Sequence, residues 1–244
     1  MSGHSHSKKI KHAKELTDQK KGQMFSKMAR AVSVAVKQGG SNPEINSKLK
    51  VIIETARSLN MPRENIERAI KQATGGIEGA NLEEVLFEAY GPGGTTIIIE
   101  GITDNKNRTL GEIKQILGQH GGKLVGEGSV KWMFERKGCI IIDTQSQMPD
   151  VNSKENLELS SIEAGADDIY WQENILNIYT KPESLEEVKK NLEAKNIKID
   201  SASLDWVAKE EISADEKTKE ACQKLFEALD ENEAVQEIYS NLKI

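Results

Sequence analysis

Aromatic residues, cysteines and long apolar runs are all scarce in this 244-residue chain. Three Trp, four Tyr and four Phe leave few surfaces on which unpaired bases could stack. No apolar run approaches the ~20 residues that span a bilayer, and the N-terminus lacks a hydrophobic signal core. We therefore expect a cytoplasmic protein with no membrane partner. Cys139 and Cys222 lie far apart without a CxxC pair, which argues against a disulfide framework or a zinc ribbon.

Sequence signatures of catalysis are also missing. The chain has no GxxxxGK[ST] phosphate loop, and its GPGGTT stretch lacks the third glycine of a dinucleotide fingerprint. No set of residues supplies a nucleophile, a base and an oxyanion donor together. Asp167 and Asp168 have no spaced ligands to complete a metal site. The sequence predicts a non-enzymatic protein without a cofactor, a metal or a small-molecule substrate.

Charge, by contrast, is abundant and unevenly distributed. The formal net charge of −6 conceals fifteen Lys or Arg against six Asp or Glu in residues 1–73, and eighteen against thirty-three in the remainder. Such asymmetry predicts a basic module that binds a polyanion and an acidic body that does not bind it. The acidic body could instead hold a protein partner.

The first 25 residues, MSGHSHSKKIKHAKELTDQKKGQMF, have four possible interpretations: an expression tag, a targeting peptide, a metal-binding tail or a cationic arm. After loss of Met1, a Ser-Gly-His terminus could chelate Cu(II) or Ni(II). No other ligand cluster supports that role, and a tag would not merge into the IKH stretch at 10–12. We favour the cationic arm over a tail that merely aids solubility, because basic residues continue beyond it at Lys48, Lys50 and Arg57.

Ammonium and guanidinium groups near phosphates release condensed counterions, so this arm predicts salt-sensitive binding to nucleic acid. The predicted nucleic-acid-binding residues are Lys8, Lys9, Lys11, His12, Lys14, Lys20, Lys21, Lys27, Arg30, Arg63, Arg68 and Lys71. Lysines hold the backbone without reading sequence, whereas Arg63, Asn65 and Arg68 are better suited to bases or a folded RNA. An exposed face salt-bridged through Glu64 and Glu67 is an equally good interpretation of the latter group.

A second candidate is the TDNKNRT loop at 103–109. Asp104 is expected to cap the helix that follows, where Arg108 could reach an anion. Asn105, Asn107 and Arg108 are therefore a possible secondary anion contact, although a purely structural turn is the favoured interpretation.

Periodicity predicts three helices and then an α+β region. Met24 to Val36 form the first helix, Asn42-Pro43 begin the second and Pro62 begins the third, which ends at Gly75. Further strands are expected at 82–90, 95–103, 129–134, 138–143, 169–172, 175–180, 198–204 and 235–239, with helices at 107–119, 155–164, 182–195 and 214–229. From residue 138 to 204 the order strand, helix, strand, strand, helix, strand matches a split βαβ, or ferredoxin-like, arrangement.

Six stretches together resemble the YebC/PmpR family. They are GHS near the start, IKH at 10–12, NMPRENIERAI at 60–70, YGPGG at 90–94, TDNKNRT at 103–109 and HGGKLVGEGSV at 120–130. That family includes bacterial regulators and the mitochondrial translational activator of cytochrome c oxidase. The chain departs from the family at Ser7 and Ala13, where a Trp and an Arg are usual.

The resemblance implies three domains in an α+β chain. They are a basic arm and three-helix bundle at 1–78, a central α+β domain at 79–133 plus 208–244, and a ferredoxin-like domain inserted at 134–207. It also implies a DNA-binding transcriptional regulator or, alternatively, a ribosome-associated translation factor that binds ribosomal RNA. The expected partner is therefore DNA, ribosomal RNA or both.

Overall fold

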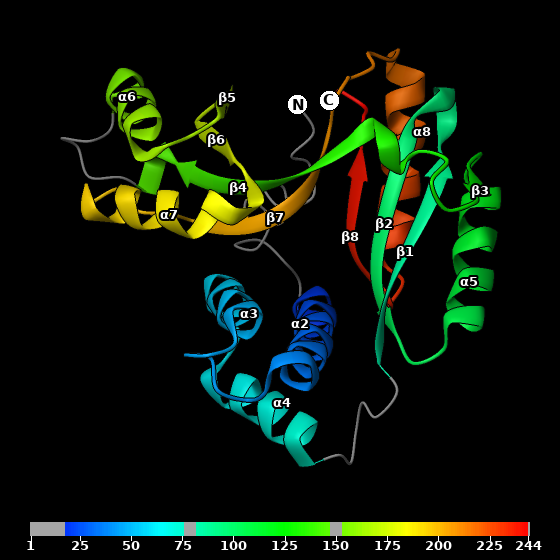
Figure 1. Cartoon of the computed structure of the whole chain (residues 1–244). Coiled ribbons are helices and arrows are strands. Elements are labelled where there is room, and N and C mark those ends of the chain that lie inside the picture. Colours follow the sequence, from blue (N-terminus) through cyan, green and yellow to red (C-terminus); the bar gives the residue numbers. More distant parts are fainter. Residues whose placement is uncertain (1–17, 76–81, 147–152, 244) are drawn as a thin grey trace.

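The computed structural model describes residues 18–75, 82–146 and 153–243. These ranges contain seven α-helices and two antiparallel sheets of four strands each, which confirms the predicted α+β class (Figure 1). The three helices nearest the N-terminus lie together at the bottom of this view. The remaining helices cover the sheets.

The N-terminal helices form what we call the helical unit. Its members are α2 (Asp18–Gly39), α3 (Ser47–Ser58) and α4 (Arg63–Gly75). Their shared core includes the buried side chains of Val32, Ala35, Leu49, Ile53 and Ile66. The predicted packing of three helices along their apolar faces is thus confirmed.

The second helix begins later than predicted. Asn46, rather than Asn42, caps α3, because its Oδ1 accepts a hydrogen bond from the Leu49 amide at 3.0 Å. The Asn46 side-chain amide also donates to the carbonyl oxygen of Ala35, at 2.8 Å, which ties the cap to α2. Ile45 precedes the helix and is 79% exposed.

The first sheet has the strand order β3-β1-β2-β8. Its strands are β1 (Glu83–Tyr90), β2 (Thr96–Thr103), β3 (Lys123–Val125) and β8 (Val235–Ser240). The predicted β1–β2 hairpin is confirmed by its antiparallel pairing, whereas the short β3 was not predicted. Two helices, α5 (Lys106–Gln119) and α8 (Glu216–Asp230), contribute Leu117 and Leu225 to the core beneath this sheet.

The second sheet has the order β5-β6-β4-β7. Its strands are β4 (Phe134–Asp143), β5 (Asp168–Gln172), β6 (Ile175–Thr180) and β7 (Ser201–Ala208). Helices α6 (Lys154–Ala164) and α7 (Leu185–Ala194) join these strands in the predicted strand, helix, strand, strand, helix, strand sequence. β4 enters this sheet from the side of the first one, and β7 leads back toward it (Figure 1).

One prediction in this region was wrong. Residues 129–134 and 138–143 were expected to form two strands joined by a polar turn, but β4 is one strand from Phe134, preceded by a 3-10 turn at Lys131–Met133. The polar residues 135–137 continue the strand because they pair with residues 205–207 of β7. Arg136 also finds a carboxylate, Glu100 of β2, at 2.9 Å.

The two sheets are joined by an apolar cluster. Ile98 and Tyr239 from the first sheet pack with Phe134 and Ala208 from β4 and β7, and all four are buried. Beside this cluster, Glu100 accepts hydrogen bonds from the side chains of Arg136, Trp206 and Tyr239 at 2.9, 2.8 and 3.3 Å. Burial raises the pKa of Glu100, and the nearby Arg136 offsets only part of that rise.

The glycine-rich HGGKLVGEGSV stretch builds a structural turn around a buried carboxylate. Glu88 accepts hydrogen bonds from the amides of Gly128, Val130 and Lys131 at 2.6, 2.6 and 2.8 Å. Burial alone would raise the pKa of Glu88, but these three donors hold the pKa below its usual value. Gly128 has a φ of +81°, a conformation that favours glycine.

Candidate nucleic-acid interface

The predicted basic arm lies largely outside the described residues. Lys8, Lys9, Lys11, His12 and Lys14 all fall in residues 1–17, so their role stays a prediction. The arm leads directly into α2, whose first turns carry the exposed Lys20 and the partly buried Lys21. The remaining predicted cations are distributed over α2 and α4.

On α2, Lys27 and Arg30 face the body rather than solvent. At 100° per residue they lie on the side of α2 opposite the helical-unit core. There they meet the sequence Asp-Glu-Asn-Glu at residues 230–233, which we call the acidic turn and which links α8 to β8. The structure therefore brings the most basic helix and a run of carboxylates together.

Three side chains of α2 bind the acidic turn. The Lys27 ammonium donates to a carboxylate oxygen of Asp230 at 2.9 Å and to the Asp230 carbonyl at 2.5 Å. The Arg30 guanidinium donates to Glu233 at 2.7 Å, and the Gln23 amide donates to the backbone carbonyl of Glu231 at 2.7 Å. Lys27 is only 7% exposed, so its ammonium is not accessible to a phosphate in this arrangement.

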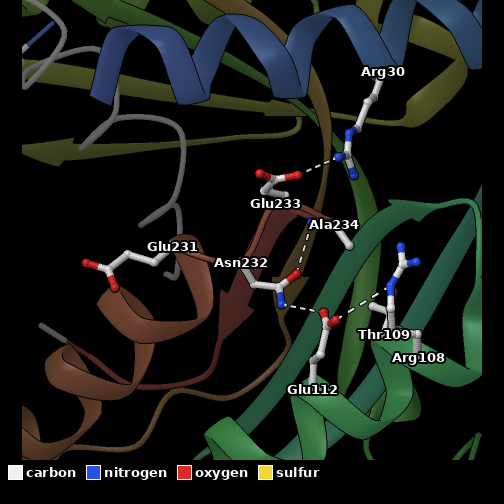
Figure 2. Close-up of a pocket in the computed structure, with 8 residues that line it drawn as sticks. All are labelled: Arg30, Arg108, Thr109, Glu112, Glu231, Asn232, Glu233 and Ala234. Carbon is white, nitrogen blue, oxygen red and sulfur yellow. Dashed lines mark hydrogen bonds and ion pairs between the residues drawn. The ribbon is translucent and has the colours of Figure 1, made fainter. Parts of the chain in front are cut away.

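A cleft of about 440 Å³ opens beside these contacts. It is lined by Arg30, Arg108, Thr109, Glu112, Glu231, Asn232, Glu233 and Ala234. Figure 2 shows Arg30 reaching Glu233 from one wall, while Asn232 and Arg108 both reach Glu112 on the other. The side chain of Glu231 points away from this group. Carboxylates thus face both arginines of the cleft.

The TDNKNRT loop forms one end of this cleft, with a different cap from the predicted one. Asn105, not Asp104, caps α5 by accepting from the Arg108 amide at 3.0 Å. Asp104 instead binds the Arg108 guanidinium at 2.5 Å, and this hydrogen bond holds the pKa of Asp104 below its usual value. Asn107 is exposed. An anion that binds Arg108 would have to compete with Asp104 and Glu112.

On α4, Arg63, Arg68 and Lys71 are all exposed. The Arg63 guanidinium donates to Glu67 at 2.6 Å, and this contact raises the pKa of Arg63. That pair fits the interpretation of a salt-bridged face, while the exposure of Arg68 and Lys71 fits a contact with nucleic acid. Both interpretations of α4 therefore stay open.

The acidic turn is the feature that sequence reasoning missed. Its signal was visible as three carboxylates within the four residues 230–233. Nothing in the local pattern indicates that this turn contacts Lys27, which is 203 positions away in the chain.

Within the described ranges, His, Cys, Asp and Glu side chains form no group of three that could hold a metal ion. Among the helices that the structure describes, none combines the length and apolarity needed to cross a bilayer.

The fold and this surface define an α+β chain whose charged helical unit docks on a two-sheet body. Two family models match it: the TACO1/YebC protein N-terminal domain over residues 5–76, and the TACO1/YebC second and third domain over residues 82–242. The chain belongs to the TACO1/YebC family. The predicted resemblance is thereby confirmed.

Relatives of similar length support this assignment. A protein from Halothermothrix orenii, called a probable transcriptional regulatory protein, is 43% identical over 100% of this chain and 96% of its own. One with the same description from Dictyoglomus turgidum is 44% identical, over 100% of this chain and 96% of the relative. The crystal structure of a conserved hypothetical protein from Aquifex aeolicus is similar with a TM-score of 0.85 and 42% identity, covering 93% of this chain and 92% of that one.

Proposed function

We propose that this protein is a non-enzymatic regulator of transcription that binds DNA through its basic arm and helical unit. The observation that carries the proposal is the segregation of charge, with fifteen basic against six acidic residues in the first 73 positions. The descriptions of full-length relatives as probable transcriptional regulatory proteins support it. Ribosomal RNA is the alternative target, because lysine binds the phosphates of either polymer.

The chemistry of the buried thiols supports a role without catalysis. Cys139 is 4% exposed and Cys222 is fully buried, and burial raises the pKa of both thiols above the ordinary value. Neither is therefore an activated nucleophile at neutral pH. We place the protein in the cytoplasm, where a nucleic-acid target would be accessible.

The proposed organisation is three domains, at 1–78, at 79–133 plus 208–244, and at 134–207. The separate family models for an N-terminal domain and for a second and third domain support this division. The order of strands in the second sheet, β5-β6-β4-β7, supports a ferredoxin-like third domain. In this proposal the arm and helical unit contact phosphates, while the acidic α+β domains form a body that could hold a protein partner.

The test removes charge from the arm. Changing Lys8, Lys9, Lys11 and Lys14 to Ala should weaken binding to all duplex sequences alike and reduce the salt slope by about three to four. Fluorescence anisotropy with two unrelated 20-base-pair duplexes at low and high NaCl measures both effects. A matched control changes four exposed lysines of the body, Lys114, Lys123, Lys190 and Lys217, to Ala. Equal losses in both variants would contradict a specific role for the arm.

A second experiment separates the two targets. The protein is crosslinked in cells, and the recovered nucleic acid is sequenced. Enrichment of promoter DNA is the expected result. Recovery of ribosomal RNA without promoter DNA would overturn the transcriptional proposal and favour the ribosomal alternative.

A further inference from the structure

Two cations predicted to bind phosphates are already bound to carboxylates of the same chain. Lys27 and Arg30 contact Asp230 and Glu233 of the acidic turn, at 2.9 and 2.7 Å. A run of carboxylates presented to a basic helix offers the same chemistry as successive phosphates, because both are oxygen anions that accept charge-assisted hydrogen bonds. The acidic turn thus accepts from α2 the same kind of hydrogen bond that a phosphate would accept.

The burial at this contact is uneven. The Lys27 side chain is 8% exposed, whereas its partner Asp230 is 53% exposed, and Glu233 is 74% exposed against 26% for Arg30. The turn is therefore the solvent-facing side of the contact. Moving it away would break its contacts with Lys27, Arg30 and Gln23, three side chains on one face of α2.

Other side-chain contacts between the helical unit and the body are ion pairs or hydrogen bonds to carboxylates. Lys48 and Gln38 both bind Glu84 at the start of β1, at 2.7 and 3.1 Å. Lys189 of α7 binds Glu54 of α3 at 2.5 Å. Within the described ranges, each hydrophobic cluster stays within the helical unit or within the sheets and their helices. In these ranges, therefore, no hydrophobic cluster spans the junction, although Val34 on the Lys27 and Arg30 side of α2 is 3% exposed and α3 also lies against β7.

We propose that the face of α2 formed by Gln23, Lys27 and Arg30 is a second phosphate-binding surface, which the acidic turn covers until nucleic acid displaces it. This inference rests on the proposed function, since it needs a polyanion that the arm brings to α2. The arm binds first and raises the local concentration of phosphate beside the turn. Phosphates then replace Asp230 and Glu233, and the helical unit moves away from the turn.

The first test compares affinities. Changing Asp230 to Asn and Glu231 and Glu233 to Gln removes three negative charges from the acidic turn. The control changes three exposed carboxylates elsewhere, Glu183, Glu187 and Glu220, to Gln, which alters net charge equally. The turn variant should bind a 20-base-pair duplex about tenfold more tightly than the control. Equal affinities would show that only net charge matters and would overturn the inference.

The second test measures the opening itself. Spin labels are attached at Ser26→Cys on α2 and Lys224→Cys on α8, both exposed positions, while the two native cysteines are buried. Distances measured by double electron–electron resonance should lengthen when duplex DNA is added. In the turn variant they should already be longer without DNA. Circular dichroism melting confirms that each variant is folded.

The outcomes separate the two proposals. Binding of DNA with an unchanged distance between the labels would overturn the covered surface and leave the proposed function standing. Absence of any DNA binding would overturn both. Binding that lengthens the distance, together with the larger affinity gain in the turn variant, is the result that the structure predicts.

Discussion

The two junctions of this molecule are built from different chemistry. The sheets meet through the buried side chains of Ile98, Phe134, Ala208 and Tyr239, whereas the helical unit meets the body through ion pairs such as Arg30 with Glu233. Burial of apolar surface is insensitive to competing ions, but exposed ion pairs are weak and screened by salt. The comparison shows which junction is held by apolar burial and which by ion pairs, and the opening that we propose lies at the second.

The largest expected loss of stability comes from a substitution at the junction between the two sheets. Phe134 is 3% exposed within the apolar cluster, so Phe134→Ala should lower the free energy of unfolding by about 3–5 kcal/mol. Urea unfolding followed by circular dichroism measures this loss. A change below about 1 kcal/mol would mean that the cluster does not hold the sheets together.

A smaller, pH-dependent effect comes from Glu100 at the same junction. Because its pKa is raised in the folded protein, the folded state binds the proton more tightly than the unfolded state. Its contribution to stability is therefore fully present below the unfolded pKa and is lost as pH rises through the folded pKa. Glu100→Gln cannot titrate, so the stability of the natural protein relative to this variant should increase from pH 7 to pH 4.5. Urea unfolding at the two pH values tests this, and the opposite trend would contradict the raised pKa.

A substitution at the junction between the helical unit and the body should change the free energy of unfolding least. Arg30 pairs with a Glu233 side chain that is 74% exposed, so Arg30→Ala should change the free energy of unfolding by about 1 kcal/mol or less. The same urea experiment applies. A loss as large as that for Phe134→Ala would remove the distinction between the two junctions.

The elements of this fold were largely predictable from local patterns. The helices around Val32 and Ile66 and the β1–β2 hairpin follow from periodicity that one segment displays by itself. The start of α3 was misplaced because Asn42-Pro43 has the composition of a helix start, while the actual cap, Asn46, is selected by its contact with the Ala35 carbonyl. The polar residues at 135–137 suggested a turn. They form part of a strand because they pair with residues of β7 some 70 positions later, and this pairing cannot be seen in the local sequence.

The candidate site was predictable in composition but not in arrangement. Counting residues is enough to show that Lys and Arg are enriched in residues 1–73. Which of these cations face solvent depends on how α2 docks, and docking buries Lys27 against Asp230 while leaving Lys20 exposed. The sequence therefore indicates a polyanion partner. Only the fold reveals that carboxylates of the same chain already bind part of the basic surface of α2.

The most direct test of phosphate binding by the basic N-terminal module is the dependence of duplex DNA affinity on salt for the intact protein, freed of bound nucleic acid. We expect the logarithm of the association constant to fall linearly with the logarithm of NaCl concentration, with a slope of roughly −0.9 for each phosphate contacted. A flat dependence, or no measurable binding at low salt, would contradict a basic N-terminal module that binds phosphates.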